Sequence, residues 1–170
     1  MSAVLSECGL YRYRLERSVN LDRPFEPRSV AFVGVNPSTA DAVSDDPTIR
    51  KMVGFARQWG YSRILVGNLF AYRAADVREL RRVYLDPFGA GTLFETESVY
   101  LLDILQEAEL LVPCWGDRKK LPRVLRERVI DVLSMLRQQP KPVCHLGLTT
   151  GGDPKHPLYL PYSTELQLWE

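Results

Sequence analysis

The run Ser29–Val35, with the sequence SVAFVGV, decides the fold class, and it ends at Asn36-Pro37. It is continuously apolar and rich in β-branched residues, which is typical of a strand that is buried on both faces. Strands of this kind belong to sheets that are covered by helices on both sides. The run therefore predicts an α/β protein, in which the Asn-Pro turn carries the chain out of the sheet.

Three later apolar runs predict further strands, at Arg63–Phe70, Glu109–Pro113 and Pro142–Leu148. The segment 10–16, LYRYRLE, comes before Ser29–Val35 and alternates apolar with charged residues. This alternation predicts a half-exposed antiparallel strand.

Helical patterns separate most of these runs. Asp46-Pro47-Thr48 supplies an N-cap and a proline at the first helical position, which predicts a helix that continues to about Trp59. Two more helices are expected at 92–107 and 121–136, the last with Val124 on its buried side, and a short helix or turn is expected at 74–83. This order of elements predicts a three-layer α/β sandwich with a mainly parallel central sheet.

Length and composition exclude several classes of protein. A chain of 170 residues, 45% hydrophobic and 25% charged, fits a single α/β domain over residues 1–170 better than a disordered or fibrous protein. Three cysteines without CxxC spacing and only two histidines argue against a structural metal centre, so we expect no metal and no cofactor. We find no signal peptide and no apolar run of membrane-spanning length, and so expect a cytoplasmic protein without a membrane partner. The oligomeric state stays open.

The net charge of +1, from 22 Lys+Arg against 21 Asp+Glu, hides an uneven distribution. The segment 118–128 contains one acid, Glu127, and six basic residues: Arg118, Lys119, Lys120, Arg123, Arg126 and Arg128. They form either a solvated helix face or a surface that faces phosphates, because the guanidinium fork matches phosphate oxygens. In the second interpretation, nucleic acid would contact Lys119, Lys120, Arg123 and Arg126.

Ligands of open parallel sheets bind beyond the carboxyl ends of the strands, so the residues that follow each strand are the candidates for a site. The first strand is followed by Asn36, Pro37, Ser38 and Asp41. A Gly-x-Asn-Pro turn suits a backbone that approaches a ligand closely, so we expect a functional role for Asn36 and Asp41. Asp46 is interpreted mainly as a helix cap.

The second and third strands end in further candidates. Asn68 offers a donor and an acceptor that suit the edge of a nucleobase, although a core asparagine bonded to neighbouring backbone fits equally. Beyond it, Tyr72 could stack on a ring and Arg73 could bind a phosphate. Trp115 is either a core aromatic or a base-stacking residue, and Cys114 is interpreted as a small buried side chain rather than a nucleophile.

The two histidines receive different interpretations. His145 falls inside an expected strand and is interpreted as a core residue. His156 follows the glycine loop 149–153, where an imidazole could donate to an oxyanion or move a proton. His156 therefore joins Asn36 and Asp41 as a candidate catalytic residue.

The ordered motifs resemble a family of small bacterial and phage proteins that is catalogued as a domain of unknown function. They are FVGVNPSTAD (32–41), DDPTIR (45–50), GNLFAYR (67–73), CWG (114–116), and LGLT with HPLYL near the end of the chain (146–160). The resemblance covers about residues 10–160, and it implies no activity.

The same order more distantly resembles the uracil-DNA glycosylase superfamily, and implies its α/β fold. Carried over, Asn36 would position the water, Asn68 would read the base, and His156 would stabilise charge on the departing base. Such enzymes extrude a nucleotide into a pocket. The chain departs from that pattern at Ser38-Thr39, and at Leu158-Tyr159 after the His-Pro pair.

Three functional hypotheses follow. The first is a metal-independent, glycosylase-like enzyme that hydrolyses an N-glycosidic bond of a nucleotide or of a base in nucleic acid. The second is a nucleotide or nucleic-acid binding module without catalysis. The third is a magnesium-dependent enzyme that uses Asp41, Asp45 and Asp46.

Overall fold

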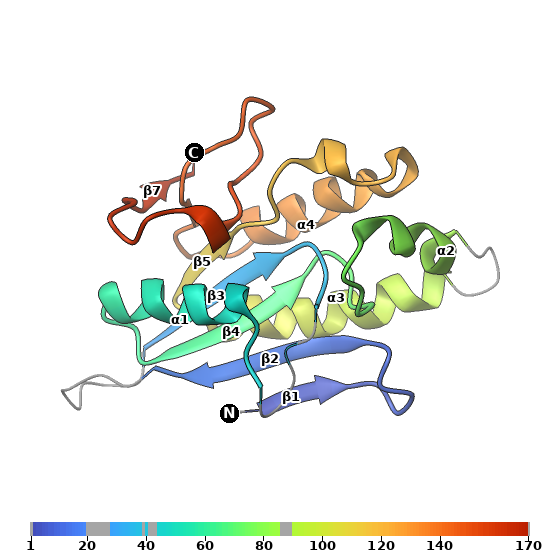
Figure 1. Ribbon diagram of the computed structural model, residues 1–170, viewed down its shortest axis with the longest axis horizontal. Helices are drawn as coiled ribbons and strands as arrows, with labels where there is room; N and C mark the ends of the chain where they lie inside the picture. Colours follow the sequence, from blue (N-terminus) through green and yellow to red (C-terminus); the bar gives the residue numbers. More distant parts are fainter. Residues whose placement is uncertain (1, 20–27, 39, 41–43, 86–89, 170) are drawn as a thin grey trace.

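The computed structural model describes residues 2–19, 28–38, 40, 44–85 and 90–169. Its main sheet has five strands in the order β1-β2-β4-β3-β5 (Figure 1). These strands are β1 Ser2–Leu5, β2 Arg12–Ser18, β3 Ser29–Gly34, β4 Arg63–Asn68 and β5 Leu110–Pro113. A second, two-stranded sheet pairs β6 Cys144–His145 with β7 Gln167–Leu168.

The main sheet is mixed. β3 pairs in parallel with β4 and β5, whereas β2 pairs antiparallel with β1 and β4. The expected α/β class is therefore confirmed, but half of the strand pairings in this sheet are antiparallel. The difference arises because the hairpin of β1 and β2 extends the edge beside β4, and the sequence analysis did not identify β1.

β3 is an interior strand of the sheet, and it is buried as its apolar run predicts. All six of its residues are buried, and it forms hydrogen bonds to a strand on each side. In the parallel register, Gly34 at the end of β3 lies beside Asn68 at the end of β4. The turns that follow these two strands therefore begin at the same edge of the sheet.

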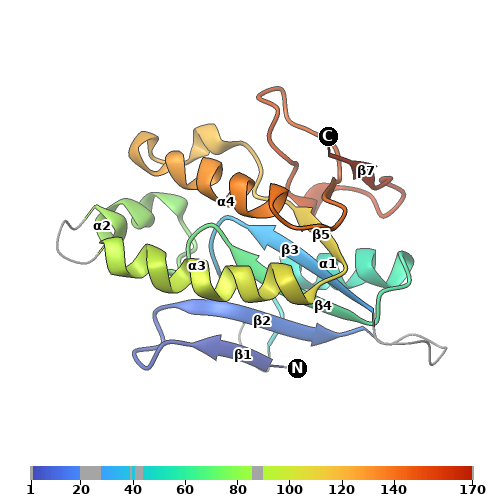
Figure 2. The same cartoon turned by 180° about the vertical axis from the view of Figure 1, so that it is seen from behind.

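Helices cover both faces of the sheet. α1, Pro47–Gln58, packs on one face (Figure 1), and α3, Ala90–Glu107, with α4, Glu127–Arg137, packs on the other (Figure 2). Phe32 contributes to the core beneath α1, and Val33 contributes to the core beneath α3 and α4. The shorter helices are α2 Leu80–Tyr84 and the 3-10 turns η1 Val77–Glu79, η2 Arg118–Lys120, η3 Arg123–Leu125 and η4 Pro157–Tyr159.

The expected helix 121–136 is shorter than predicted. Its α-helical part begins only at Glu127, after the two 3-10 turns η2 and η3. Pro122 lies between these turns, and proline restricts the residue before it and lacks a backbone N–H. Val124, which was expected on the buried side, is 59% exposed.

The expected strand 142–148 is also shorter than predicted. Only Cys144–His145 forms a strand, and its partner is β7. Val143 still makes a parallel bridge to Leu111 of β5, so the segment lies along that edge of the main sheet. The strand ends because the chain turns at Gly147, whose φ of +94° is open to glycine and strained for other residues.

The segment 10–16 forms an antiparallel strand as expected, but one of its charged residues is buried. The pairing of β1 with β2 matches Val4 with Arg14 and Leu5 with Arg12, so it skips Tyr13. Such a bulge changes which side chains share a face. Arg12 is consequently only 3% exposed and lies among the residues of the pocket described below.

Within the part of the chain that the structure describes, the helices are too short or too polar to cross a membrane.

Candidate functional site

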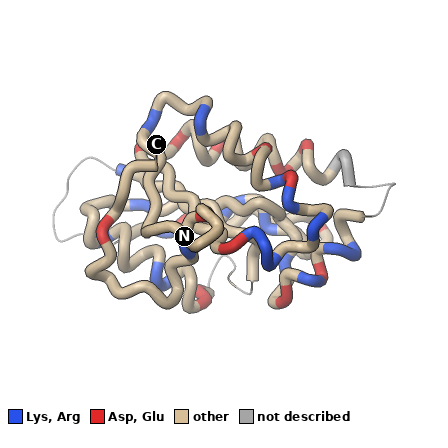
Figure 3. Tube along the Cα trace, turned by 90° about the horizontal axis from the view of Figure 1, so that it is seen from above, with Lys and Arg blue, Asp and Glu red and all other residues tan. Residues whose placement is uncertain are grey.

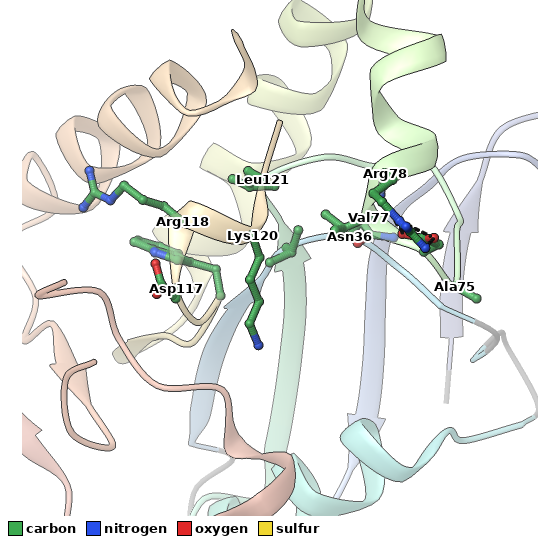
Figure 4. Close-up of a pocket in the computed structure, with 11 residues that line it drawn as sticks. Asn36, Ala75, Val77, Arg78, Asp117, Arg118, Lys120 and Leu121 are labelled. Atoms are coloured by element: carbon green, nitrogen blue, oxygen red, sulfur yellow. Dashed lines mark hydrogen bonds and ion pairs between the residues drawn. The ribbon is translucent and has the colours of Figure 1, made fainter. Parts of the chain in front are cut away.

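Two pockets adjoin at the edge where β3 and β4 end. The inner pocket has a volume of about 170 Å³ and is lined by Arg12, Gly34, Val35, Asn36, Ser38, Asp46, Thr48, Ile49, Met52, Val66, Asn68, Ala74, Ala75 and His156. The outer pocket has a volume of about 530 Å³ and is lined by Val35, Asn36, Ala75, Asp76, Val77, Arg78, Trp115, Asp117, Arg118, Lys120 and Leu121 (Figure 4). Both are lined by Val35, Asn36 and Ala75, so they meet beside the turn that follows β3.

The inner pocket brings together three of the residues that the sequence singled out: Asn36, Asn68 and His156. They come from the end of β3, the end of β4 and the segment before η4. A cavity of about 150 Å³ holds a benzene-sized ring, so the inner pocket can hold one small planar ring. Its apolar walls come from Ile49 and Met52 of α1.

Asn68 lies where its carboxamide can contact a ligand. Its Nδ2 is buried and has no hydrogen-bond partner among the described residues. Its Oδ1 would lie 2.9 Å from a Cβ placed on Gly34, so the space for this carboxamide depends on glycine at position 34. A core asparagine bonded to the backbone would use Nδ2 as a donor to a carbonyl, and no such bond is present among the described residues. An unsatisfied buried N–H costs about 1–3 kcal/mol, which a ligand oxygen could recover.

The carboxamide of Asn36 is held by the neighbouring backbone. Its Nδ2 donates to the carbonyl oxygen of Ala74 at 2.7 Å and to that of Pro37 at 3.1 Å. These two acceptors identify the nitrogen of the amide, because an oxygen in the same place would face two carbonyls. The Oδ1 atom is thereby oriented as the acceptor that Asn36 can offer to another molecule.

His156 reaches the inner pocket as a neutral donor. Its Nδ1 accepts a hydrogen bond from the backbone N–H of Leu158 at 3.3 Å, so the proton of the neutral ring lies on Nε2. Burial lowers the pKa of His156, the charge of Lys120 lowers it further, and the charge of Asp46 opposes both effects. The imidazole therefore stays neutral at pH 7 and offers Nε2–H as a donor.

An ion pair whose carboxylate is buried connects the loop before His156 to the segment after β5. Asp153, 1% exposed, accepts from Arg118 at its backbone N (3.0 Å) and at Nε (2.6 Å). Gly116 N also donates to the carbonyl of Pro154 at 2.8 Å. These contacts bring His156 beside Gly116, where a Cβ would lie 3.7 Å from the Cβ of His156. No local sequence pattern predicts this connection, because the paired residues are 35 positions apart.

Arg12 is a pocket residue that the sequence analysis missed. Its Nη1 donates to the carbonyl of Ala40 at 2.6 Å, across the segment that follows the Asn36 turn. The alternating pattern of 10–16 placed Arg12 with Arg14 and Glu16 on the exposed side. Only an irregularity in the pattern at Tyr13 could have indicated otherwise, and the sequence shows none.

The outer pocket is lined by Trp115 and by charged side chains (Figure 4). Trp115 is 3% exposed and packs in the core near Trp169, as expected for a core aromatic. Its Nε1 is buried and has no hydrogen-bond partner among the described residues. Base stacking by Trp115 stays a prediction.

Several candidates lie outside the inner pocket. Tyr72 packs edge-on against Tyr11, with ring centroids 5.5 Å apart, and lines neither pocket. Arg73 donates to the carbonyl of Gly9 at 3.2 Å and lines a shallow hollow with Ser38. Pro37 is buried, and its carbonyl accepts from Ala74 N and from Asn36. Asp41 lies outside the described residues.

The basic segment 118–128 does not form one uniform face. Arg128 is 5% exposed and donates to the carbonyl of Leu69, so it is a core residue rather than part of a surface. Arg126 donates to the carbonyls of Leu121 and Lys119. Lys119, Lys120 and Arg123 are exposed. In Figure 3, the positions of Lys and Arg are interspersed with those of Asp and Glu along the trace.

The acids after the Asn36 turn have structural partners where they are described. Asp46 caps α1 by accepting from the backbone N–H of Ile49 at 2.8 Å, which confirms the expected cap. Asp45 forms an ion pair with Arg17 at 2.6 Å. Among the described residues, His, Cys, Asp and Glu do not gather in any group of three that could hold a metal ion. The magnesium hypothesis also needs Asp41, which lies outside the described residues, and it stays a prediction.

Cys114 and His145 are buried, in agreement with the expectation. Burial raises the pKa of the Cys114 thiol to about 12, which keeps it protonated and unreactive at neutral pH. His145 accepts from the backbone N–H of Gly147 at 3.0 Å and lies edge-on to Trp169. Neither residue lines the inner or the outer pocket.

A buried group of three residues, Tyr84, Glu97 and Arg128, holds the loop that follows Asn68. The N–H of Ala71 donates to Glu97 Oε1 at 2.8 Å, and the hydroxyl of Tyr84 donates to the same oxygen. The hydroxyl of Tyr84 also accepts from the N–H of Tyr72 at 3.2 Å. Burial raises the pKa of Glu97, against the opposing effects of these hydrogen bonds and of the Arg128 charge.

Comparison with known families gives one match, over residues 12–158, to a family described as "Protein of unknown function (DUF1643)". The comparisons with curated proteins and with solved structures gave no match. The matched range contains Asn36, Asn68 and His156, together with every strand of the main sheet except β1. The chain therefore belongs to the DUF1643 family of proteins of unknown function.

Proposed function

We propose that the protein is a glycosylase-like hydrolase that cleaves the N-glycosidic bond of a nucleotide without a metal ion. The observation that carries this proposal is the convergence of Asn36, Asn68 and His156 on one ring-sized pocket. Two of these residues offer N–H donors, and the third offers an oriented amide oxygen. Two donors can bind oxygens of a base, and the amide oxygen can orient a water molecule toward the sugar, so this set suits hydrolysis of the bond between them.

In the proposed reaction the bond between C1′ of the sugar and the base nitrogen breaks, and its electron pair leaves with the base. A water molecule adds its oxygen to C1′, and its proton ends on the base. The Oδ1 of Asn36 accepts a hydrogen bond from this water and orients it. The Nε2–H of His156 donates to the oxygen where negative charge develops on the departing base, as a neutral imidazole can do.

The donors in the inner pocket favour a base that carries carbonyl oxygens. Both the Nδ2–H of Asn68 and the Nε2–H of His156 require an acceptor. Uracil, thymine and hypoxanthine offer such oxygens. The exocyclic amino group of adenine is itself a donor, so it cannot accept a hydrogen bond from either of these groups. We therefore expect keto bases to be preferred.

The distant resemblance to the uracil-DNA glycosylase superfamily agrees with this proposal. The motifs that carry the resemblance end at one edge of the sheet, where Gly116 of the Trp-Gly pair lies against His156. The three parallel strands β3, β4 and β5 form the part of the sheet from which these motifs project. A glycosylase-like core with an added antiparallel hairpin is the fold that we propose.

The experiment is a screen for base release with purified protein, followed by chromatography. Substrates are nucleosides, nucleotides and oligonucleotides that carry uracil, thymine, hypoxanthine or adenine. Asn36→Ala and His156→Ala should lose at least 100-fold in rate while their thermal unfolding remains cooperative. Tyr159→Ala is the matched control, because this side chain is 92% exposed and lies three residues after His156. If every substrate stays intact, the catalytic proposal is refuted.

The second candidate is a binding module for nucleotides that uses the same pockets without catalysis. The observation in its favour is Lys120, an exposed cation that lines the outer pocket and whose charge lowers the pKa of His156. The screen separates the two candidates, because a binding module would retain affinity for a keto nucleotide and release no base from it.

A further inference from the structure

Two charged side chains of the outer pocket, Asp117 and Lys120, have no ion pair among the described residues. Arg78 pairs with Asp76 at 2.6 Å, and Arg118 pairs with Asp153 at 2.6 Å. Asp117 accepts from the backbone N–H of Lys119 at 2.8 Å. The ammonium of Lys120 has no ion pair among the described residues, so it is the cation of this pocket that an anion can contact without displacing a carboxylate.

The charge of Lys120 lies in the outer pocket and acts on His156 of the inner pocket. Figure 4 shows its side chain between the Asp117–Arg118 side and the Asn36–Arg78 side of the outer pocket. Its charge also lowers the pKa of His156, which lines the inner pocket. An anion bound at Lys120 would thus lie near a ring held in the inner pocket. The turn at Asn36, which lines both pockets, lies between the two positions.

The surface around these pockets does not suit a long polyanion. Proteins that bind nucleic acid neutralise several phosphates, and each contact adds to the salt dependence. Here Arg128 is buried, Arg126 is bonded to backbone carbonyls and Arg118 is paired with Asp153. Tyr72, the expected stacking residue, packs against Tyr11 instead. Lys119 and Arg123 are exposed but line neither pocket, so Lys120 is the member of this segment that combines exposure, a place in the outer pocket and the absence of an ion pair among the described residues. This arrangement matches one phosphate group.

We infer that the ligand of this site is a free nucleoside 5′-monophosphate, with its base in the inner pocket and its phosphate bound by Lys120 in the outer pocket. This inference rests on the proposed function for the place of the base, and it adds the substrate class. The volume of about 530 Å³ falls in the range of small-molecule sites and accommodates a sugar with its phosphate.

The test measures binding by calorimetry and base release by chromatography for three forms of the same base. They are deoxyuridine, deoxyuridine 5′-monophosphate, and a single-stranded oligonucleotide with one deoxyuridine; the corresponding hypoxanthine series is run in parallel. We expect the monophosphate to bind at least tenfold more tightly than the nucleoside, because a charge-assisted contact to phosphate is among the strong hydrogen bonds. Oligonucleotides should bind no more tightly than the monophosphate.

Lys120→Ala should reduce the affinity for the monophosphate at least tenfold and leave the affinity for the nucleoside within about twofold. Lys155→Ala is the matched control, because Lys155 is exposed, directly precedes His156 and lines neither pocket. Circular dichroism verifies that both variants fold. Equal affinity of nucleoside and monophosphate, or equal losses in the two variants, would overturn the inference.

The outcomes distinguish a failure of this inference from a failure of the proposed function. Binding of the monophosphate through Lys120 without release of any base refutes catalysis and retains the ligand class. Release of base from the oligonucleotide alone retains the glycosylase and overturns the inference. Absence of both binding and release in the two series refutes both.

Discussion

The Glu97 carboxylate provides a sharp test of how the loop beyond Asn68 is held in place. Glu97 is 4% exposed, and its Oε1 accepts from the N–H of Ala71 at 2.8 Å and from the hydroxyl of Tyr84. Glu97→Ala leaves both donors buried without this acceptor. An unsatisfied buried group costs about 1–3 kcal/mol, so two donors predict a loss of about 2–6 kcal/mol in the free energy of unfolding.

Glu97→Gln is the matched comparison, because it keeps an oxygen that can accept from both donors and removes only the ionisable group. We expect it to lose less than about 1 kcal/mol at pH 4.5, the lowest pH of the unfolding series, where the two side chains differ least in charge. The difference in the free energy of unfolding between the Ala and Gln variants therefore measures how much the acceptor oxygen contributes to stability. The same variants report on the site, because Ala71 lies three residues after Asn68.

The pH dependence follows from the pKa of Glu97, which burial raises above its ordinary value of 4.5. The folded protein then keeps the proton to a higher pH than the unfolded chain does. The stabilising contribution of this group is present in full below pH 4.5 and is lost as pH rises through the folded pKa. The Gln variant carries no such proton, so its stability relative to the unmodified protein should increase from pH 4.5 upward.

The assay is urea unfolding of the three proteins at several values from pH 4.5 to pH 8, followed by circular dichroism. Midpoints should shift while the slope of the free energy against urea stays constant. Base release should fall in Glu97→Ala and persist in Glu97→Gln. The reasoning is refuted if both variants lose the same free energy, or if the difference between Glu97→Gln and the unmodified protein does not change with pH.

Two further substitutions test residues that line the inner pocket, one for base release and one for the stability of α1. Gly34→Ala places a Cβ 2.9 Å from Asn68 Oδ1, which forces the carboxamide to move, so base release should fall at least tenfold with little change in the unfolding temperature. Gly151→Ala is its control, because the nearest atom to that Cβ lies 3.7 Å away; equal activity of the two variants would contradict the role given to Gly34. Asp46→Ala removes the cap of α1 and should cost about 1 kcal/mol in thermal or urea unfolding, whereas Asp46→Asn should retain the cap. An unchanged midpoint in Asp46→Ala would show that the cap contributes nothing.

The strands β3, β4 and β5 could be predicted because each is a short apolar run whose burial does not depend on details elsewhere. The start of α1 could be predicted because a cap and a proline are local signals, and Asp46 confirms this. The predicted lengths of α4 and β6 were wrong. The apolar pattern extends further than each element does. Pro122 precedes the start of α4, and Gly147, with its positive φ, turns the chain after β6.

The candidate site could be predicted in part by the same reasoning. Asn36 and Asn68 end neighbouring parallel strands, so their convergence follows once the two runs are assigned to one sheet. His156 was selected on its chemistry, and its place beside Gly116 depends on the pairing of Asp153 with Arg118. Their catalytic roles stay predictions.

The residues themselves are sufficient to predict the α/β class, a strand that is buried on both faces and the edge of the sheet where a site is expected, because these depend on local apolar runs and strand direction. Only the tertiary structure decides which arginines are available. Arg12 turns into a pocket at a bulge, Arg128 is buried beneath the loop after β4, and Arg118 is paired with Asp153. The side chain of arginine is long enough to reach solvent, a carbonyl or a carboxylate, so its partner is set by packing between distant segments. Lys120 remains as the cation that lines the outer pocket without an ion pair among the described residues.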